Sequence, residues 1–454
     1  MSYIAAIDQL NAMVPELHTP SGQPHRKFSL DEVRVLLAAL GDPQQRFPSV
    51  LIAGTNGKGS TACTLASILT ASGLEAGLYT SPHLEHVNER IRIGRAEIAD
   101  DAFAGLFFRV HDTAQKLVRE GNLQQQPSFF EILTAQALLY FAEAGVQIAV
   151  LEVGMGGRLD ATNAVDPLLS VITDISLDHT EWLGSTIAAI AREKAGILRP
   201  GGTLIALPQH PEADQVLNEA AVELGVRCVN ASDYMPNMPP NGAIAVDPCR
   251  PYRIEALGES IEVNSPLAGR HQQRNIALAI AAAVELAGKH GFPVTPATIA
   301  AGIRDTNWPG RLERFEIGSV EWILDVAHNS AGATALQAGL GGVMGDKRPR
   351  TLIFSCLSDK PLAEMARILF PEFDRVILAP IHSARAESMD NLLAAASAMG
   401  THAVAADSVA QALWLAEEQA KQSVGGGVVV VSGSVYLVGE ARARLVSRKT
   451  GILI

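Results

Sequence analysis

Residues Ala53–Thr61 read AGTNGKGST, and the fold assigned to the surrounding chain depends on this stretch. It follows the apolar run SVLIA (49–53) and precedes a segment of helical period, so it is predicted to be the turn between a buried strand and a helix. In the common phosphate-binding loop a glycine lies five positions before the Gly-Lys pair, and Ser or Thr follows the Lys. Here Ile52 and Gly59 stand in those places, which leaves two readings: a variant nucleotide loop or an ordinary glycine-rich turn.

The length and charge of the chain limit what it can be. Its 454 residues exceed what one hydrophobic core spans, so two domains are expected. The formal net charge is -12 and no long run of Lys or Arg occurs, which argues against nucleic acid or an anionic membrane as partner. The N-terminus lacks a signal-peptide pattern and no apolar run has membrane-spanning length, so we expect a soluble, cytoplasmic protein. The cysteines show no CxxC spacing, which argues against a zinc knuckle.

Apolar segments of strand length alternate with segments of helical period over most of the chain. This alternation predicts a parallel sheet with helices on both faces. One helix has readable ends, since Ser128 and Glu131 have capping-box spacing and Gly145 follows its last residue. The strands expected in this first part are SVLIA (49–53), AGLYT (76–80), QIAVLEV (147–153), LLSVIT (168–173) and GTLIAL (202–207).

Two later segments interrupt this pattern. Residues 230–265 are rich in Pro, Asn and Gly and predict an irregular insertion with short antiparallel strands. The Pro and Gly of TNWPGRLERFE (306–316) indicate a linker, beyond which the alternation restarts. The predicted fold is α/β: a P-loop-type doubly wound parallel sheet domain (1–307) followed by a smaller Rossmann-like α/β domain (308–454). Strands are expected in the second domain at VEWILDVA (320–327), RTLIFS (350–355), RVILAP (375–380), HAVAA (402–406) and GVVVVSGS (427–434).

As a nucleotide loop, the opening turn would act through its backbone and its charge. Free N–H groups at the start of the next helix, and the helix dipole, would face a bound anion. Gly57 and Gly59 would let the backbone approach phosphate, while Lys58 would offer a positive charge. Ser60 or Thr61 would offer a hydroxyl to Mg²⁺. The alternative is a solvated lysine on an ordinary turn.

Candidate ligands also follow other predicted strands. Because the carboxyl ends of parallel strands share one edge of a sheet, these side chains are expected to converge there. Each taken singly also reads as a helix cap or a structural histidine. They are Glu152, Ser81 and His83, and Asp178, His179 and Glu181 in the first part, and Asp325, His328, Asn329, Ser432, Gly433 and Ser434 in the second. Lys194 in IAREKAGIL has a surface salt-bridged helix as its alternative reading.

Several strings occur in order between residues 54 and 440: GTNGKGS, TSPHL, ERIRI, FFE, LEVGMGGRLDATN, LDHTEWLG, REKAGI, GRHQQRN, WPGRLE, DVAHN and SGSVYLVGE. Together they resemble the folylpolyglutamate synthase and dihydrofolate synthase family, within the Mur-type amide ligases. The resemblance favours the nucleotide-loop reading, because these ligases use a loop with this displaced glycine. The stretch 17–33 departs from the family pattern, in a region that the resemblance places over the pterin.

The resemblance implies a role for particular residues. The phosphates of ATP would be held by Gly54, Thr55, Asn56, Gly57, Lys58, Gly59 and Ser60, and the rest of the nucleotide would be contacted by Asn275, Arg311 and Asp325. Mg²⁺ would be held by Ser81, Glu152, His179 and Lys194, the last as a CO₂ carbamate, which turns a cation into an anion beside metal and phosphate. The pterin would be surrounded by Ser128, Phe130, Leu159, Asp160 and Ala161, and the incoming glutamate by His328 and Ser434. Catalysis would depend on Lys58, Lys194 and His179.

The leading hypothesis is a monomeric, ATP-dependent amide ligase that adds L-glutamate to dihydropteroate and to (tetrahydro)folate through an acyl phosphate. A folylpolyglutamate synthase without the dihydropteroate activity is the nearest alternative. A ligase of cell-wall precursors is disfavoured by the FFE and RLDATN strings. A switch NTPase is disfavoured because the guanine-reading NKxD string is absent and Glu replaces the strand-end Asp. A non-catalytic folate-binding protein would bind without releasing ADP.

Overall fold

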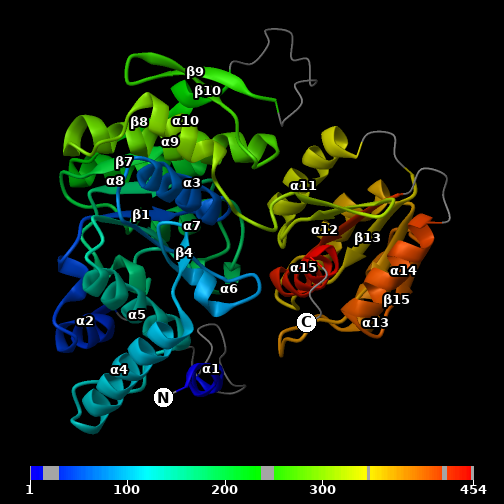
Figure 1. Cartoon of the computed structure of the whole chain (residues 1–454), viewed down its shortest axis with the longest axis horizontal. Coiled ribbons are helices and arrows are strands. Elements are labelled where there is room, and N and C mark those ends of the chain that lie inside the picture. Colours follow the sequence, from blue (N-terminus) through cyan, green and yellow to red (C-terminus); the bar gives the residue numbers. More distant parts are fainter. Residues whose placement is uncertain (1, 14–29, 237–249, 345–347, 422–426, 451–454) are drawn as a thin grey trace.

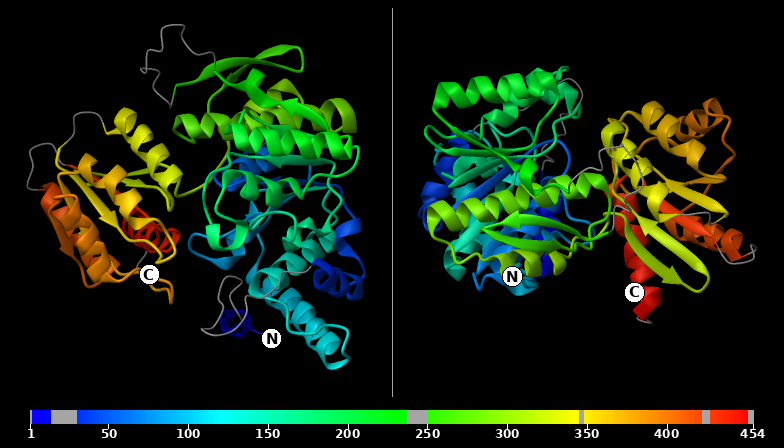
Figure 2. Two further views of the ribbon diagram at one scale, coloured as in Figure 1. Left: turned by 180° about the vertical axis from the view of Figure 1, so that it is seen from behind. Right: turned by 90° about the horizontal axis from the view of Figure 1, so that it is seen from above.

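The structure, a computed structural model, describes residues 2–13, 30–236, 250–344, 348–421 and 427–450. It contains two large sheets, one built from strands between residues 49 and 230 and the other from strands between 313 and 432. Figure 1 shows the two sheets, each with its own covering helices, lying side by side, and Figure 2 shows the same arrangement from behind and from above.

The first sheet has eight strands in the order β4-β3-β2-β5-β1-β6-β7-β8. Its central strands are parallel, while β3 and β4 add an antiparallel edge. β1 lies between β5 and β6, and later strands are added on both sides of it, so the strand order reverses at β1. Ligands of such sheets bind at the carboxyl ends of the strands beside this point. The bounds are β1 Ser49–Ala53, β2 Ala76–Tyr79, β3 Ile91–Ile93, β4 Ala96–Glu97, β5 Ile148–Glu152, β6 Leu169–Ile172, β7 Thr203–Ala206 and β8 Arg227–Asn230.

Helices cover both faces of this sheet, and each face has its own apolar core. One face carries α3 (Lys58–Ala71), α9 (Arg270–His290), α10 (Pro296–Arg304) and the hairpin β9 (Tyr252–Ala256) and β10 (Glu259–Val263). The other carries α1 (Tyr3–Ala12), α2 (Leu30–Ala39), α4 (Asp100–Arg119), α5 (Phe129–Ala144), α7 (Ile187–Ala195) and α8 (Pro211–Leu224). Short helical turns are η1 (Pro43–Gln45), η2 (Val87–Arg90), η3 (Ala161–Ala164), η4 (Ala231–Tyr234) and α6 (Thr180–Leu183).

The second sheet has six strands in the order β11-β12-β16-β13-β14-β15. All are parallel except β11, which pairs antiparallel with β12. The strands are β11 Glu313–Ile317, β12 Val320–Leu324, β13 Arg350–Phe354, β14 Arg375–Leu378, β15 Ala403–Ala405 and β16 Val428–Ser432. One face is covered by α11 (Ser330–Val343), α12 (Leu362–Leu369) with η5 (Phe370–Glu372), and α13 (Met389–Ala398), the other by α14 (Val409–Lys421) and α15 (Val435–Thr450).

The predicted fold class is confirmed, and the five strands expected in the first part agree with the structure to within one residue at each end. The capping box of Ser128 and Glu131 and the left-handed Gly145 bound α5 as the sequence indicates. A short antiparallel hairpin does lie within 230–265, where residues 237–249 are outside the described ranges, as are residues 14–29 of the stretch 17–33. No helix in the described ranges combines the length and apolarity that a bilayer crossing needs.

Four short strands were not predicted: β3, β4, β8 and β11. The last of these corrects the expected linker, because residues 313–316 already belong to the second sheet and only 306–312 connect the two units. We propose domain bounds of 1–307 and 308–454 on this basis.

Gly302 lies where α10 crosses α3, and a Cβ added there would lie 2.3 Å from Ile68 Cα. Gly302→Ala is therefore expected to lower the free energy of unfolding by about 1–3 kcal/mol through overpacking. Gly288→Ala is the matched control, since Gly288 is an exposed helical glycine with open space around it, and this change should raise stability by roughly 0.5–1 kcal/mol. Urea titration of both variants gives the two signs, and an unchanged Gly302→Ala would contradict the close contact.

Candidate active site

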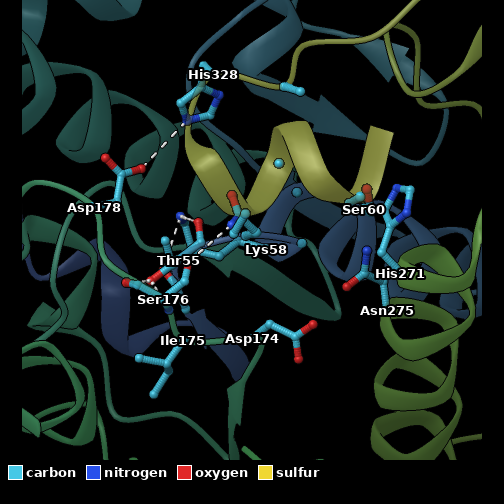
Figure 3. Close-up of a pocket in the computed structure, with 18 of the residues that line it drawn as sticks. Thr55, Lys58, Ser60, Asp174, Ile175, Ser176, Asp178, His271, Asn275 and His328 are labelled. Atoms are coloured by element: carbon cyan, nitrogen blue, oxygen red, sulfur yellow. Dashed lines mark hydrogen bonds and ion pairs between the residues drawn. The ribbon is translucent and has the colours of Figure 1, made fainter. Parts of the chain in front are cut away.

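The residues of the opening turn line a cavity of about 500 Å³ at the carboxyl ends of β1, β5 and β6. Gly57 has a φ of 89° and caps α3, whose first N–H groups have no partner within the helix. Lys58 and Ser60, at the start of this helix, line the cavity (Figure 3). A Cβ at Gly57 would lie 2.1 Å from Asn275 Oδ1, and one at Gly59 would lie 2.8 Å from Trp308 Cζ2. The turn therefore needs glycine at both positions, and it offers backbone donors to an anion.

Neighbouring segments hold this turn in place. The backbone N–H groups of Thr55 and Asn56 donate to Asp174 O at 2.9 and 3.2 Å. The Thr55 hydroxyl donates to Ser176 O at 3.0 Å and accepts from Ser176 N at 3.1 Å. Lys58 Nζ folds back onto the carbonyls of Gly54 and Thr55 at 3.2 and 3.1 Å. The loop after β6 thus holds one side of the phosphate turn, hereafter the cradle.

Lys194 of α7 also contacts this turn. Its Nζ donates to Gly54 O at 2.7 Å and its side chain is buried. Burial, followed by the positive charge of Lys58, lowers the pKa of Lys194 to about 7. A large share of Lys194 is therefore a neutral amine at neutral pH, unlike an exposed lysine, and a neutral amine is a nucleophile.

Three further predicted ligands line the same cavity. Glu152 ends β5, and its Oε2 accepts the backbone N–H of Ser81, which follows the neighbouring β2, at 3.0 Å. Burial raises the pKa of Glu152, with Lys58 acting in the opposite direction. His179 lies after β6 with a φ of 50°, and burial lowers its pKa to about 4, so its ring is neutral and able to bind a metal. Ser81, Glu152, His179 and Lys194 all line the cavity.

The three predicted nucleotide residues outside the turn also line this cavity. Asn275 donates from Nδ2 to Gln272 Oε1 at 2.9 Å, which orients its amide toward the turn. Arg311 is half-buried near Asp325, and its guanidinium lies 5.9 Å from the centre of the Trp308 ring. Asp325 accepts the backbone N–H of Leu312 at 3.0 Å and that of Ala327 at 2.9 Å, so its carboxylate ties the connection between the domains to the turn after β12.

A polar junction centred on Asp178 joins the loop after β6 to the second domain beside the phosphate turn. Asp178 accepts from Asn329 Nδ2 and from Lys360 Nζ, both at 2.9 Å, and His328 Nε2 lies 3.8 Å away. Asn329 also donates to Asn56 Oδ1 at 3.1 Å. Burial alone would raise the pKa of Asp178, but His179, Lys360 and His328 outweigh it and lower that pKa. The junction places a second-domain cation within reach of the phosphate turn.

The residues predicted around the pterin do not line this cavity. Ser128 caps α5, with its Oγ accepting from Glu131 N at 3.3 Å, and Phe130 is buried against Gly154 and Tyr79. Asp160 accepts from the backbone N–H groups of Met155 and Thr162, both at 2.9 Å, next to half-buried Leu159 and buried Ala161. Ser434 is buried and accepts from Tyr436 N at 3.2 Å, whereas its neighbour Val435 reaches the cavity. Each thus has a structural partner, and its binding role stays a prediction.

Several cavity residues were missed from the sequence. Asp174 accepts three hydrogen bonds of 2.6, 2.9 and 3.0 Å from Arg274, and His271 lies nearby in Figure 3. Asp174 follows β6 directly, so the strand-end rule could have found it. Trp308 and Lys360 do not line the cavity but contact Gly59 and Asp178, which do, and no sequence signal marked them, because these contacts join positions far apart in sequence.

The site has the composition expected of a ligase that uses a nucleoside triphosphate, and the comparisons agree. Residues 52–283 match the Mur ligase middle domain and residues 310–435 match the Mur ligase, glutamate ligase domain. The fold and site therefore define a Mur-type ligase.

Named relatives narrow this class. The folylpolyglutamate synthase of Lacticaseibacillus casei is 36% identical over 77% of this chain and 80% of its own length. The dihydrofolate synthase/folylpolyglutamate synthase of Bacillus subtilis is 32% identical over 92% of this chain and 95% of its own. The structure of Mycobacterium tuberculosis folylpolyglutamate synthase complexed with ADP superposes with a TM-score of 0.87 at 32% identity, covering 98% of this chain and 99% of that one. The chain belongs to the folylpolyglutamate synthase/dihydrofolate synthase family, which confirms the resemblance read from its motifs.

Gly57→Ala is expected to weaken ATP binding by about 10-fold or more, because the new Cβ collides with Asn275 and the backbone favours glycine. Gly73→Ala is the control, since Gly73 shares the positive φ but has open space around it and lies away from the cavity. Calorimetric titration with ATP measures both. Equal affinities for the two variants would show that the cradle does not hold the nucleotide.

Proposed function

We propose that this protein is an ATP-dependent amide ligase that adds L-glutamate to dihydropteroate and to (tetrahydro)folate, and so is both a dihydrofolate synthase and a folylpolyglutamate synthase. The carrying observation is that one cavity collects the phosphate turn of the first domain and Arg311, Asp325 and His328 of the second. A ligase needs this arrangement, since it must present a phosphorylated acid to an amine in one closed site.

The chemistry follows from the weakness of a carboxylate as an acyl donor. A carboxylate oxygen of the pterin substrate attacks the γ-phosphorus of ATP, and the bond from that phosphorus to the β-γ bridging oxygen breaks to release ADP. The glutamate amine then attacks the acyl carbon, and the tetrahedral intermediate expels phosphate as the amide forms. Lys58 and the N–H groups at the start of α3 stabilise charge on the phosphoryl group as it moves.

We assign the remaining cavity residues to this scheme. Ser81, Glu152, His179 and a Lys194 carbamate are the residues that would hold Mg²⁺, and the ion would supply positive charge to neutralise the phosphates of ATP. In the described ranges no cluster of three or more His, Cys, Asp or Glu is placed to hold a metal. Magnesium commonly binds through one or two carboxylates together with phosphate and water oxygens, so the buried Glu152 fits this ion.

The substrate pockets follow the family pattern. Ser128, Phe130, Leu159, Asp160 and Ala161 would surround the pterin, which this assignment would put beside the start of α5 and η3. His328 and Ser434 would contact the incoming glutamate. We further propose a cytoplasmic monomer. Folylpolyglutamate synthase activity alone remains the second candidate, because the L. casei relative carries that name.

The direct test is ADP release by purified protein with ATP, labelled glutamate and either dihydropteroate or tetrahydrofolate. ADP and labelled product should form only when glutamate and a pterin acceptor are both present. Product from tetrahydrofolate alone would reduce the assignment to folylpolyglutamate synthase. Steady ADP release that depends on neither glutamate nor a pterin acceptor would instead favour a switch NTPase.

Lys194 should take up CO₂, because its neutral form predominates above the lowered pKa of about 7. In ¹³CO₂-equilibrated buffer, ¹³C NMR is expected to show a carbamate signal that strengthens from pH 6 to pH 8, since the ammonium form below the pKa cannot add CO₂. Lys194→Met should lose the signal and nearly all turnover while keeping most ATP affinity. Wild-type turnover in Lys194→Met would remove the carbamate from the mechanism.

A further inference from the structure

The loop that follows β2, residues Ser81–His86 (hereafter the β2 loop), links the predicted metal site to the second domain. At its start, Ser81 N donates to Glu152 Oε2 at 3.0 Å. At its end, the Glu89 carboxylate accepts the backbone N–H groups of Leu84, Glu85 and His86 at 2.7, 2.7 and 2.8 Å. Charge-assisted hydrogen bonds to carboxylates therefore hold both ends of the β2 loop.

The tip of this loop is seated on α15. Leu84 packs against the apolar cluster that contains Leu437 and Val438 of that helix. A Cβ added at Gly439 would lie 1.9 Å from Leu84 O, so the helix backbone and the loop backbone are in direct contact. Contact this close requires glycine at position 439 and fixes the height of the loop above the helix.

One arginine of α15 ties the same tip to the start of the second domain. Arg442 Nε donates to the Glu313 carboxylate at 2.9 and 3.0 Å, and its Nη1 pairs with Glu85 Oε1. The three side chains are only 22%, 20% and 15% exposed, so the pairs are shielded from solvent. Glu313 in turn accepts Gly310 N at 2.8 Å, directly before the cavity residue Arg311.

We propose that Arg442 is a positioning residue for the ligase reaction. Arg442 holds Glu85 of the β2 loop on one side and Glu313 of β11 on the other. It thereby fixes the positions of Ser81 and Arg311 relative to each other, but only when the second domain is docked on the β2 loop. Arg442 does not line the cavity, so it acts through these two segments. The inference rests on the proposed function for its effect on turnover, but the coupling of α15 to the β2 loop is independent of which substrates are joined.

The test compares Arg442→Gln with Arg444→Gln, its matched control. Arg444 lies on the same helix, is about half exposed, and pairs only with Glu440 of α15 among the ion pairs of the described residues. Arg442→Gln is expected to speed hydrogen exchange of peptides covering 81–86 by about 10-fold or more. It should also lower kcat by about 10- to 100-fold with an unchanged KM for ATP, because the phosphate turn itself is untouched. Arg444→Gln should leave all three values unchanged.

Two further variants keep the proposal decisive. The conservative variant Arg442→Lys keeps a positive charge between Glu85 and Glu313 and should retain part of the kcat and of the exchange protection that Arg442→Gln loses. Gly439→Ala pushes the loop away without changing charge, and should mimic Arg442→Gln. Wild-type exchange at 81–86, or wild-type kcat, in Arg442→Gln would overturn the proposal. A wild-type protein without glutamate-dependent ADP release would refute the proposed function instead, and the exchange data would still decide the coupling.

Discussion

The narrow space around the turn Gly54–Ser60 is the constraint on which the rest of the structure depends. Gly57 lies against Asn275 of α9, Gly59 against Trp308 of the connection between domains, and the carbonyl of Gly54 receives Lys194 of α7. Segments from three distant parts of the sequence therefore touch one short piece of backbone. A cradle held from three sides keeps its N–H groups aimed at the cavity at no cost when an anion arrives, which is what electrostatic stabilisation of phosphoryl transfer requires.

The same crowding sets the charge balance of the site. Lys58 and Lys194 both donate to Gly54 O, so two amines compete in a space with little water. The repulsion between the two amines is reduced because the pKa of Lys194, the more buried of the two, is lowered. Glu152 supplies a negative charge near Lys58. A polyphosphate would reverse this balance, since it brings more negative charge than the two lysines can neutralise. Conversion of Lys194 into an anion then makes sense only together with a divalent cation, and the two modifications of charge depend on each other.

The central strands were predictable because each is apolar throughout and ends at a turn residue, and the strand-end rule then placed Ser81, Glu152 and His179 at one edge. Strands β3, β4 and β8 could not be predicted from apolar runs, because they are short and partly exposed. Strand β11 was not predicted because Pro309 and Gly310, which precede it, indicated a linker. Lys360 and Trp308 escaped for a different reason: their contacts depend on how two domains dock, and spacing along the chain carries no such information. Motif matching supplied Asp160 and Phe130, but their visible contacts are those of a capped turn and a core ring.

The two sides of the domain contact differ in chemistry. At Asp178 the partners are amides, an ammonium and an imidazole, and water can replace each of these contacts at small net cost. At Leu84 the contact is apolar and backbone to backbone, and separating it exposes apolar surface with no compensation. The polar side borders the cavity that substrates must enter, whereas the apolar side borders the connection at 306–312. A hinge beside the connection, with a separable polar wall beside the cavity, would allow the second domain to open at the cavity and then exclude water while the β2 loop keeps its contact with α15.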